Sequence, residues 1–154
     1  MFQGQKRREH RERKPPTEKQ LRDMERETWN RINQARKRAK LPPLVWDESV
    51  VRVARDHSRR MAEANFFDHR DPRYGEVDQR LNRFRVRWRM CGENIFTCNG
   101  YARPAQLAVE EWMKSPGHRR NILTAEFTHT GIGIVYRRDG SYYFTQIFIR
   151  PPES

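Results

Sequence analysis

The chain has 154 residues, of which 32 are Lys or Arg and 20 are Asp or Glu, for a formal net charge of +12. This length fits one domain with its own core, and no apolar run is long enough for a membrane-spanning helix. The first ten residues also lack the apolar segment of a signal peptide. The positive charge favours anionic partners in general, but no specific nucleic-acid motif chooses among them.

The amino-terminal segment is the most basic part of the chain. Residues 1–16 are dense in charge and end in a proline pair, which predicts a disordered basic arm in front of one domain over residues 17–154. The first 40 residues hold 14 Lys or Arg against 6 Asp or Glu. They are therefore a candidate surface for nucleic acid, anionic lipid or another polyanion.

Two helices are predicted in the first half of the domain. Thr17 is the expected N-cap of the first, whose apolar residues recur at helical spacing until Pro42 and Pro43 end it. Asp47 is the expected N-cap of the second, which ends near Asn65. In this second helix His57 falls on the apolar face, so we expect a packed histidine rather than a ligand.

Residues 77–84 predict a short helix, and residues 84–90 then alternate between apolar residues and arginine. This period of two predicts a strand with one buried and one solvated face. The strand is expected to end before Cys91. The solvated face would carry Arg85, Arg87 and Arg89. Arginines opposite a buried face need no partner, so we infer no function from them.

A helix of about three turns is predicted from Pro104, ending near Met113. Pro116 cannot continue this helix and Gly117 permits a sharp turn, so we expect His118 to follow a turn that fixes its position.

Two strands, residues 130–137 and 141–150, close the chain and are joined by the hairpin signal Asp139-Gly140. Gly131 and Gly133 indicate that another part of the chain approaches the first of these strands closely. The last strand is apolar on both sides, so helices should cover both faces of the sheet. We therefore predict an α+β fold, a three-layer α/β/α sandwich with a mainly antiparallel central sheet.

Five segments follow one another in the sequence: NFFDH (65–69), CGENI (91–95), AVEEWMKSPGHRRNIL (108–123), FTHTGIGIV (127–135) and YYFTQIF (142–148). In this order they resemble a bacterial member of the CAP superfamily of cysteine-rich secretory, antigen 5 and pathogenesis-related 1 proteins, also called SCP domains. The resemblance covers residues 20–150. It implies an α/β/α sandwich, an extracellular or cell-surface location, and a central cavity lined in many members by two histidines and two acidic residues.

The resemblance carries over three cavity residues directly: His69, Glu93 and His118. The fourth cavity residue, an acid in many members, has no acidic counterpart in this chain. Where bacterial members often have this acid, the chain has His129, and where eukaryotic members have it, the chain has Ser115. The expected binding pocket is His69, Glu93, His118 and His129. Glu110 and Glu111 are close in sequence, but nothing in the sequence directs them inward.

Imidazole and carboxylate suit a divalent ion such as Zn²⁺, with His69, Glu93 and His118 as candidate ligands. The alternative is a structural cluster in which Glu93 holds a neighbouring imidazole in one tautomer. No catalytic residue is assigned, because the Ser115 and His118 pair has no oriented partner in the sequence. Asn94 is expected to bond backbone near the cavity.

The chain has two cysteines, Cys91 and Cys98, with six residues between them. A disulfide across this short loop and a free buried thiol are both compatible with the spacing.

Three functions follow as hypotheses. The first is a secreted or surface-associated binding module that holds an unidentified ligand, and a divalent metal such as zinc, in the histidine and glutamate pocket. The second is a metal-assisted hydrolase, protease-like in its chemistry, that uses the same pocket. The third is a basic polyanion-binding protein that acts through residues 1–40. A shared fold does not choose among them.

Overall fold

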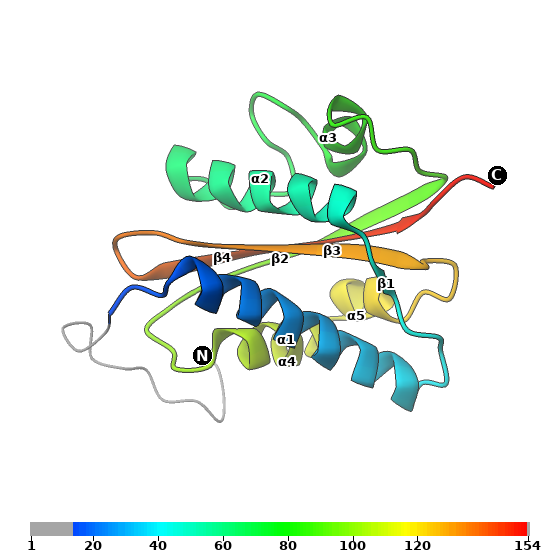
Figure 1. Cartoon of the computed structure of the whole chain (residues 1–154), viewed down its shortest axis with the longest axis horizontal. Coiled ribbons are helices and arrows are strands. Elements are labelled where there is room, and N and C mark those ends of the chain that lie inside the picture. The colour runs from blue at the N-terminus through cyan, green and yellow to red at the C-terminus, as the bar shows by residue number, and fades with distance from the viewer. Residues whose placement is uncertain (1–13, 154) are drawn as a thin grey trace.

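Helices cover both faces of a four-stranded sheet in the computed structural model, which describes residues 14–153 (Figure 1). The predicted arm, residues 1–16, lies outside the described residues except for its last three. The helices are α1 (Glu18–Arg38), α2 (Glu48–Ala64), α3 (Val77–Arg83), α4 (Pro104–Lys114) and α5 (Pro116–Ile122). The strands are β1 (Val45–Trp46), β2 (Met90–Asn99), β3 (His129–Tyr136) and β4 (Ser141–Arg150).

The sheet has the strand order β1-β3-β4-β2, in which only the β1 and β3 pair is parallel. Helices α2 and α3 lie over one face, and α1, α4 and α5 lie over the other (Figure 1). The predicted α+β sandwich with a mainly antiparallel sheet is therefore confirmed. Side chains of β4 alternate between the two cores, with Phe144 and Phe148 on the α1 and α4 side and Ile147 and Ile149 on the α2 side.

Local side-chain caps start the two long helices where the sequence predicts. Thr17 forms a capping box with Gln20 at the start of α1. Asp47 Oδ1 accepts a hydrogen bond from the Ser49 N–H at the start of α2. Asn65 ends α2 in the left-handed conformation, with a φ of 55°.

Helix α2 packs against β3 at backbone contact distance. A Cβ on Gly131 would lie 2.3 Å from the Val51 nitrogen, and a Cβ on Gly133 would lie 2.2 Å from the Arg55 nitrogen. The close approach that the two glycines predicted is therefore the approach of α2, and their role is packing.

The outer edge of β3 is covered by side chains where β1 ends. Glu25 of α1, which is 1% exposed, accepts a hydrogen bond of 3.0 Å from the Ile134 N–H. Arg22 donates to the Ile134 carbonyl oxygen at 2.9 Å, and Arg55 of α2 holds the Glu25 carboxylate at 2.7 Å. These contacts join both long helices to the edge of the sheet.

The strand predicted over residues 84–90 is wrong. Phe84 ends α3, and Arg85 turns the chain in the left-handed region with a φ of 61°. The ladder between β2 and β4 starts only at Met90, which pairs with Arg150, and continues through Cys91 to Asn99. Pro151 and Pro152 follow Arg150 and have no N–H to extend the ladder. Before Met90, only the Arg89 N–H reaches β4, donating to the Arg150 carbonyl oxygen at 2.7 Å, and residues 85–88 stay outside the sheet.

The sharp turn predicted at Pro116 and Gly117 is also wrong. Ser115 ends α4 and at the same time caps α5, in which Pro116 occupies the first turn. Gly117 has no positive φ, and a Cβ built on it would meet nothing within 4 Å. His118 is consequently held by a helix and not by a turn.

Candidate functional site

One pocket of about 530 Å³ is lined by His69 and His118, the two histidines that the resemblance carries over directly. It opens between β2, α4, α5 and the loop that follows α2, and we call it the histidine pocket. Its lining residues are Phe67, Asp68, His69, Ile95, Phe96, Thr97, Glu111, Trp112, Ser115 and His118. No Lys or Arg is among them, although the chain carries a net charge of +12.

His69 is held by a buried ion pair at the base of the pocket. Its Nδ1 donates to Glu93 Oε1 at 3.0 Å, and Arg80 Nη2 donates to the same oxygen at 2.8 Å. The side chains of Arg80 and Glu93 are 1% and 2% exposed, whereas that of His69 is 45% exposed. Arg80 also donates to the His69 carbonyl oxygen, so α3 fixes both the backbone and the side-chain partner of this histidine.

His118 is oriented from α4 and from β2. Its Nδ1 lies 2.9 Å from Ser115 Oγ, and either atom can donate, depending on the tautomer. Asn94 Nδ2 donates to the His118 carbonyl oxygen at 3.0 Å, as predicted for a backbone contact near the cavity. Asn121 completes the link between β2 and α5 by donating to Asn94 Oδ1 and to the Glu93 carbonyl oxygen.

His129 does not join the other three predicted pocket residues. It pairs with Val45 of β1 and Ile149 of β4, and its Nδ1 is bonded to Thr128 Oγ1 at 2.8 Å. Strand β4 lies between β3 and β2, so His129 starts a different strand from the one that carries Glu93. Glu111 and Ser115 line the histidine pocket in its place.

Sequence reasoning missed Glu111 and Arg80. Glu111, Ser115 and His118 have the spacing of one helical face, but the turn expected at Pro116 hid this signal because it broke the helical period. Arg80 has no such signal, since an arginine in a short helix is usually exposed. Only the tertiary fold shows that it pairs with Glu93.

The other titratable groups near the site have structural roles. His57 is fully buried, and its Nε2 contacts the Asp68 carbonyl oxygen at 2.8 Å, in agreement with the packed histidine predicted from its position. Cys91 and Cys98 both remain thiols. Burial raises the pKa of Cys91 to about 11, so its reactive thiolate form is suppressed.

We expect the two pocket histidines to titrate on opposite sides of the ordinary value of 6.5. The hydrogen bond to Glu93 raises the pKa of His69, while burial and the neighbouring His69 lower the pKa of His118. Protonation of His69 therefore stabilises the fold below pH 6.5, and this contribution is lost as pH rises through the raised pKa. Protonation of His118 destabilises the fold. This loss of stability grows as the pH falls from 6.5 through the lowered pKa of His118.

An NMR titration of the histidine ring protons measures both values, with His69→Gln and His118→Gln to assign the resonances. A His69 pKa at or below 6.5 would contradict the proposed bond between Glu93 and His69.

Residues 29–148 match the model of the CAP family, described as the cysteine-rich secretory protein family, and the chain belongs to this family. The Bacillus subtilis protein YkwD is 40% identical over 117 residues, which are 76% of this chain and 43% of YkwD. An extracellular SCP-domain protein of Bacillus anthracis has a crystal structure that aligns with a TM-score of 0.78 and 32% identity, covering 90% of this chain and 45% of that one. The chain thus spans less than half of either relative.

A more distant structure, NaASP2 solved with Zn²⁺, aligns with a TM-score of 0.62 and 15% identity over 87% of this chain and 83% of that one. It shares the fold alone. Within residues 14–153, no helix combines the length and the apolar composition that crossing a membrane requires.

Proposed function

We propose that this protein is a secreted or surface-associated CAP-domain binding module whose histidine pocket holds a divalent cation through His69 and His118. The observation that carries the proposal is the matched orientation of the two imidazoles. Each has its Nδ1 bonded to a side-chain oxygen, Glu93 Oε1 for His69 and Ser115 Oγ for His118. The Glu93 carboxylate can only accept, so neutral His69 carries its proton on Nδ1, and the Ser115 hydroxyl can accept from Nδ1 of His118 in the same tautomer. In that tautomer each ring keeps its lone pair on Nε2.

The donor set fits zinc better than it fits a hard cation. Imidazole nitrogen is a usual ligand of Zn²⁺, and a ligating histidine commonly donates its other N–H to a carboxylate or another oxygen. Glu93 fits this supporting role, because its Oε1 accepts hydrogen bonds from both His69 and Arg80, and its Oε2 lies 2.8 Å from the same Arg80 nitrogen. Among residues 14–153, no three His, Cys, Asp or Glu side chains converge as a complete ligand set. Two imidazoles from the chain would leave the remaining positions to water or to a ligand.

The surroundings of the pocket support a cation. Asp68 and Glu111 are the acidic residues of the lining, and neither Lys nor Arg lines the pocket, so the local field favours a bound cation in an otherwise basic protein. A bound divalent ion would supply a Lewis-acidic centre and an exchangeable position for a ligand oxygen. The zinc in the NaASP2 structure and the extracellular location of the Bacillus anthracis relative agree with this function.

Zinc titration by calorimetry tests the proposal on protein without a histidine tag. His69→Ala and His118→Ala should each weaken binding by well over tenfold, or more than about 1.4 kcal/mol. His129→Ala is the matched control and should bind like the parent, because His129 does not line the pocket. When the solution is acidified, His69 is protonated first because its pKa is raised above 6.5. The affinity for zinc should therefore start to fall while the pH is still above 6.5.

Two results would contradict the proposal. If the parent protein binds no zinc, nickel or magnesium at neutral pH, the histidines form a structural hydrogen-bonded cluster instead. If His129→Ala weakens binding as much as His118→Ala, the site lies elsewhere.

A further inference from the structure

The segment between α3 and β2 carries three arginines. Arg89 lies 3.3 Å from the Glu153 carboxylate, whereas Arg85 and Arg87 have no carboxylate partner within residues 14–153. The sequence predicts a strand here, in which the arginines would form a solvated face, but the structure shows a loop with two pockets beside it. The larger, about 640 Å³, is lined by Asn82, Arg85, Val86, Arg87, Trp88 and Pro152. The smaller, about 400 Å³, is lined by Arg89, Met90, Ala125, Glu126 and Arg150.

The larger pocket has two cationic residues and no acidic residue in its lining. The side chains of Arg85 and Arg87 form no hydrogen bond or ion pair with any residue in the described range 14–153. Their charge is therefore open to solvent or to a ligand.

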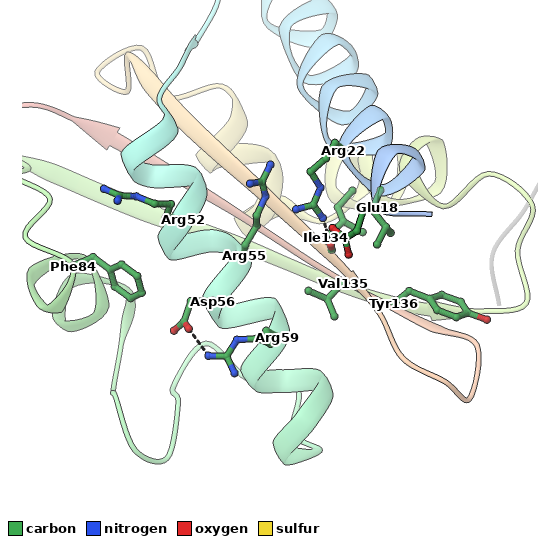
Figure 2. Close-up of a pocket in the computed structure, with 11 residues that line it drawn as sticks. Glu18, Arg22, Arg52, Arg55, Asp56, Arg59, Phe84, Ile134, Val135 and Tyr136 are labelled. Atoms are coloured by element: carbon green, nitrogen blue, oxygen red, sulfur yellow. Dashed lines mark hydrogen bonds and ion pairs between the residues drawn. The ribbon is translucent and has the colours of Figure 1, made fainter. Parts of the chain in front are cut away.

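A third arginine-lined pocket, of about 470 Å³, shows how ion pairing changes the charge that arginines leave available (Figure 2). It lies across α2, next to the start of α1 and the end of β3. There Arg22 and Arg55 both bond to the buried Glu25, and Arg59 bonds to Asp56 and to Glu63. Most of the arginines in this pocket are neutralised by internal carboxylates. The pocket is therefore a weaker anion site than the one formed by Arg85 and Arg87.

The loop is also ordered by specific contacts. The Arg85 N–H donates to the Asn82 carbonyl oxygen, and Val86 is bonded in the same way to Leu81, which holds Arg85 at its positive φ of 61°. Trp88 is half-buried, and its Nε1 donates to Asn82 Oδ1 at 2.9 Å. The guanidinium groups therefore extend from a fixed turn beside a fixed indole ring.

We propose that Arg85, Arg87 and Trp88 form a binding site for a phosphodiester chain. A guanidinium group matches two oxygens of one phosphate, and an adjacent indole can stack on a sugar or a base. The smaller pocket is a weaker candidate, because Arg89 is paired with Glu153 and Glu126 is also in its lining. The site lies on the folded domain, in addition to the basic residues 1–40.

The test compares the full-length double variant Arg85→Gly/Arg87→Gln with the control Arg120→Gln/Arg138→Gln. Glycine keeps the positive φ at residue 85. Both pairs remove two positive charges, but Arg120 and Arg138 are exposed residues on α5 and in the hairpin turn, outside residues 1–40 and outside both pockets of the loop. The probe is a fluorescent single-stranded thymidine oligonucleotide, titrated by anisotropy at several salt concentrations.

We expect the Arg85 and Arg87 variant to bind at least tenfold more weakly at low salt, and its salt slope to fall by about 1.4, since each phosphate contact contributes about 0.7. The control should stay within twofold of the parent. Equal losses in both double variants, or a loss in neither, would overturn the proposal and leave binding to net charge or to the amino-terminal residues.

A glycerol phosphate polymer, which has phosphodiesters but no base, identifies the source of the phosphate. If it binds as well as the oligonucleotide and loses affinity in the Arg85 and Arg87 variant, the site recognises phosphates alone. If the oligonucleotide binds more tightly and Trp88→Leu removes that advantage, the site takes nucleic acid. A Trp88→Leu protein with unchanged thermal unfolding is required for this comparison.

Discussion

Replacing Arg80 with methionine is expected to lower the free energy of unfolding by about 3–5 kcal/mol, because the change leaves the buried carboxylate of Glu93 without its cation. Methionine fills much of the space of the arginine stem, so the loss reports the polar partners of Arg80, which are the Glu93 carboxylate and the Gly75 and His69 carbonyl oxygens, and not a cavity. Urea or guanidinium unfolding, followed by circular dichroism, measures it. The change also removes the bond from Arg80 to the His69 carbonyl oxygen, so the histidine pocket should lose its order with the fold.

The double variant Arg80→Met/Glu93→Met is the control for this result. It removes both charges, and replacing a whole buried pair with apolar residues is often close to neutral. We therefore expect it to recover most of the lost stability. A double variant as unstable as Arg80→Met alone would mean that packing around α3, rather than the uncompensated carboxylate, causes the loss.

The second large effect is expected for Gly133→Ala, which should cost about 3 kcal/mol or more. The new Cβ would lie within 2.2–2.5 Å of the α2 backbone at Ala54 and Arg55, where no flexible side chain can move aside. Helix and strand would have to separate, and overpacking of this kind destabilises a core. Thermal and denaturant unfolding of the purified variant measure the effect.

Gly117→Ala is the matched control, since the same substitution adds a methyl group where nothing lies within 4 Å. Gly117 is also inside α5, where alanine is the better helix former by about 0.5–1 kcal/mol. Gly117→Ala should therefore leave the free energy of unfolding unchanged or raise it. A loss of stability in Gly117→Ala similar to that in Gly133→Ala would refute the assignment of Gly133 to close helix packing.

Much of the fold can be predicted because its signals are local. The caps at Thr17 and Asp47 and the hairpin turn at Asp139-Gly140 each act within a few residues, and all appear in the structure. The apolar pattern of the last strand likewise predicts helices on both faces.

The two wrong predictions of local structure, the strand over residues 84–90 and the turn at Pro116, concern segments whose structure depends on neighbouring elements. Residues 84–90 have the pattern of a strand, but a strand needs a partner, and β4 ends at Arg150 before two prolines. Pro116 does stop α4, yet a proline is also a good first residue, and α5 starts there at once. Sequence patterns show what a residue permits and not which neighbour it will have.

The candidate site divides in the same way. Motifs placed His69, Glu93 and His118 in one region, and the structure brings His69 to Glu93 and lines one pocket with both histidines. His129 was assigned by its position in a motif, but strand order carries it away from that pocket. Arg80 of α3 balances the charge of Glu93, and no local sequence pattern predicts this pair.

The contacts of Glu25 and Arg22 with Ile134 have a consequence for association between molecules. Strand β1 is only two residues long, so most of β3 would otherwise present unpaired backbone groups at the edge of the sheet, where a strand of another chain could add. The two side chains already occupy both the N–H and the carbonyl oxygen of Ile134. A foreign strand would have to displace a buried carboxylate that Arg55 also holds, which protects the protein against edge-to-edge aggregation.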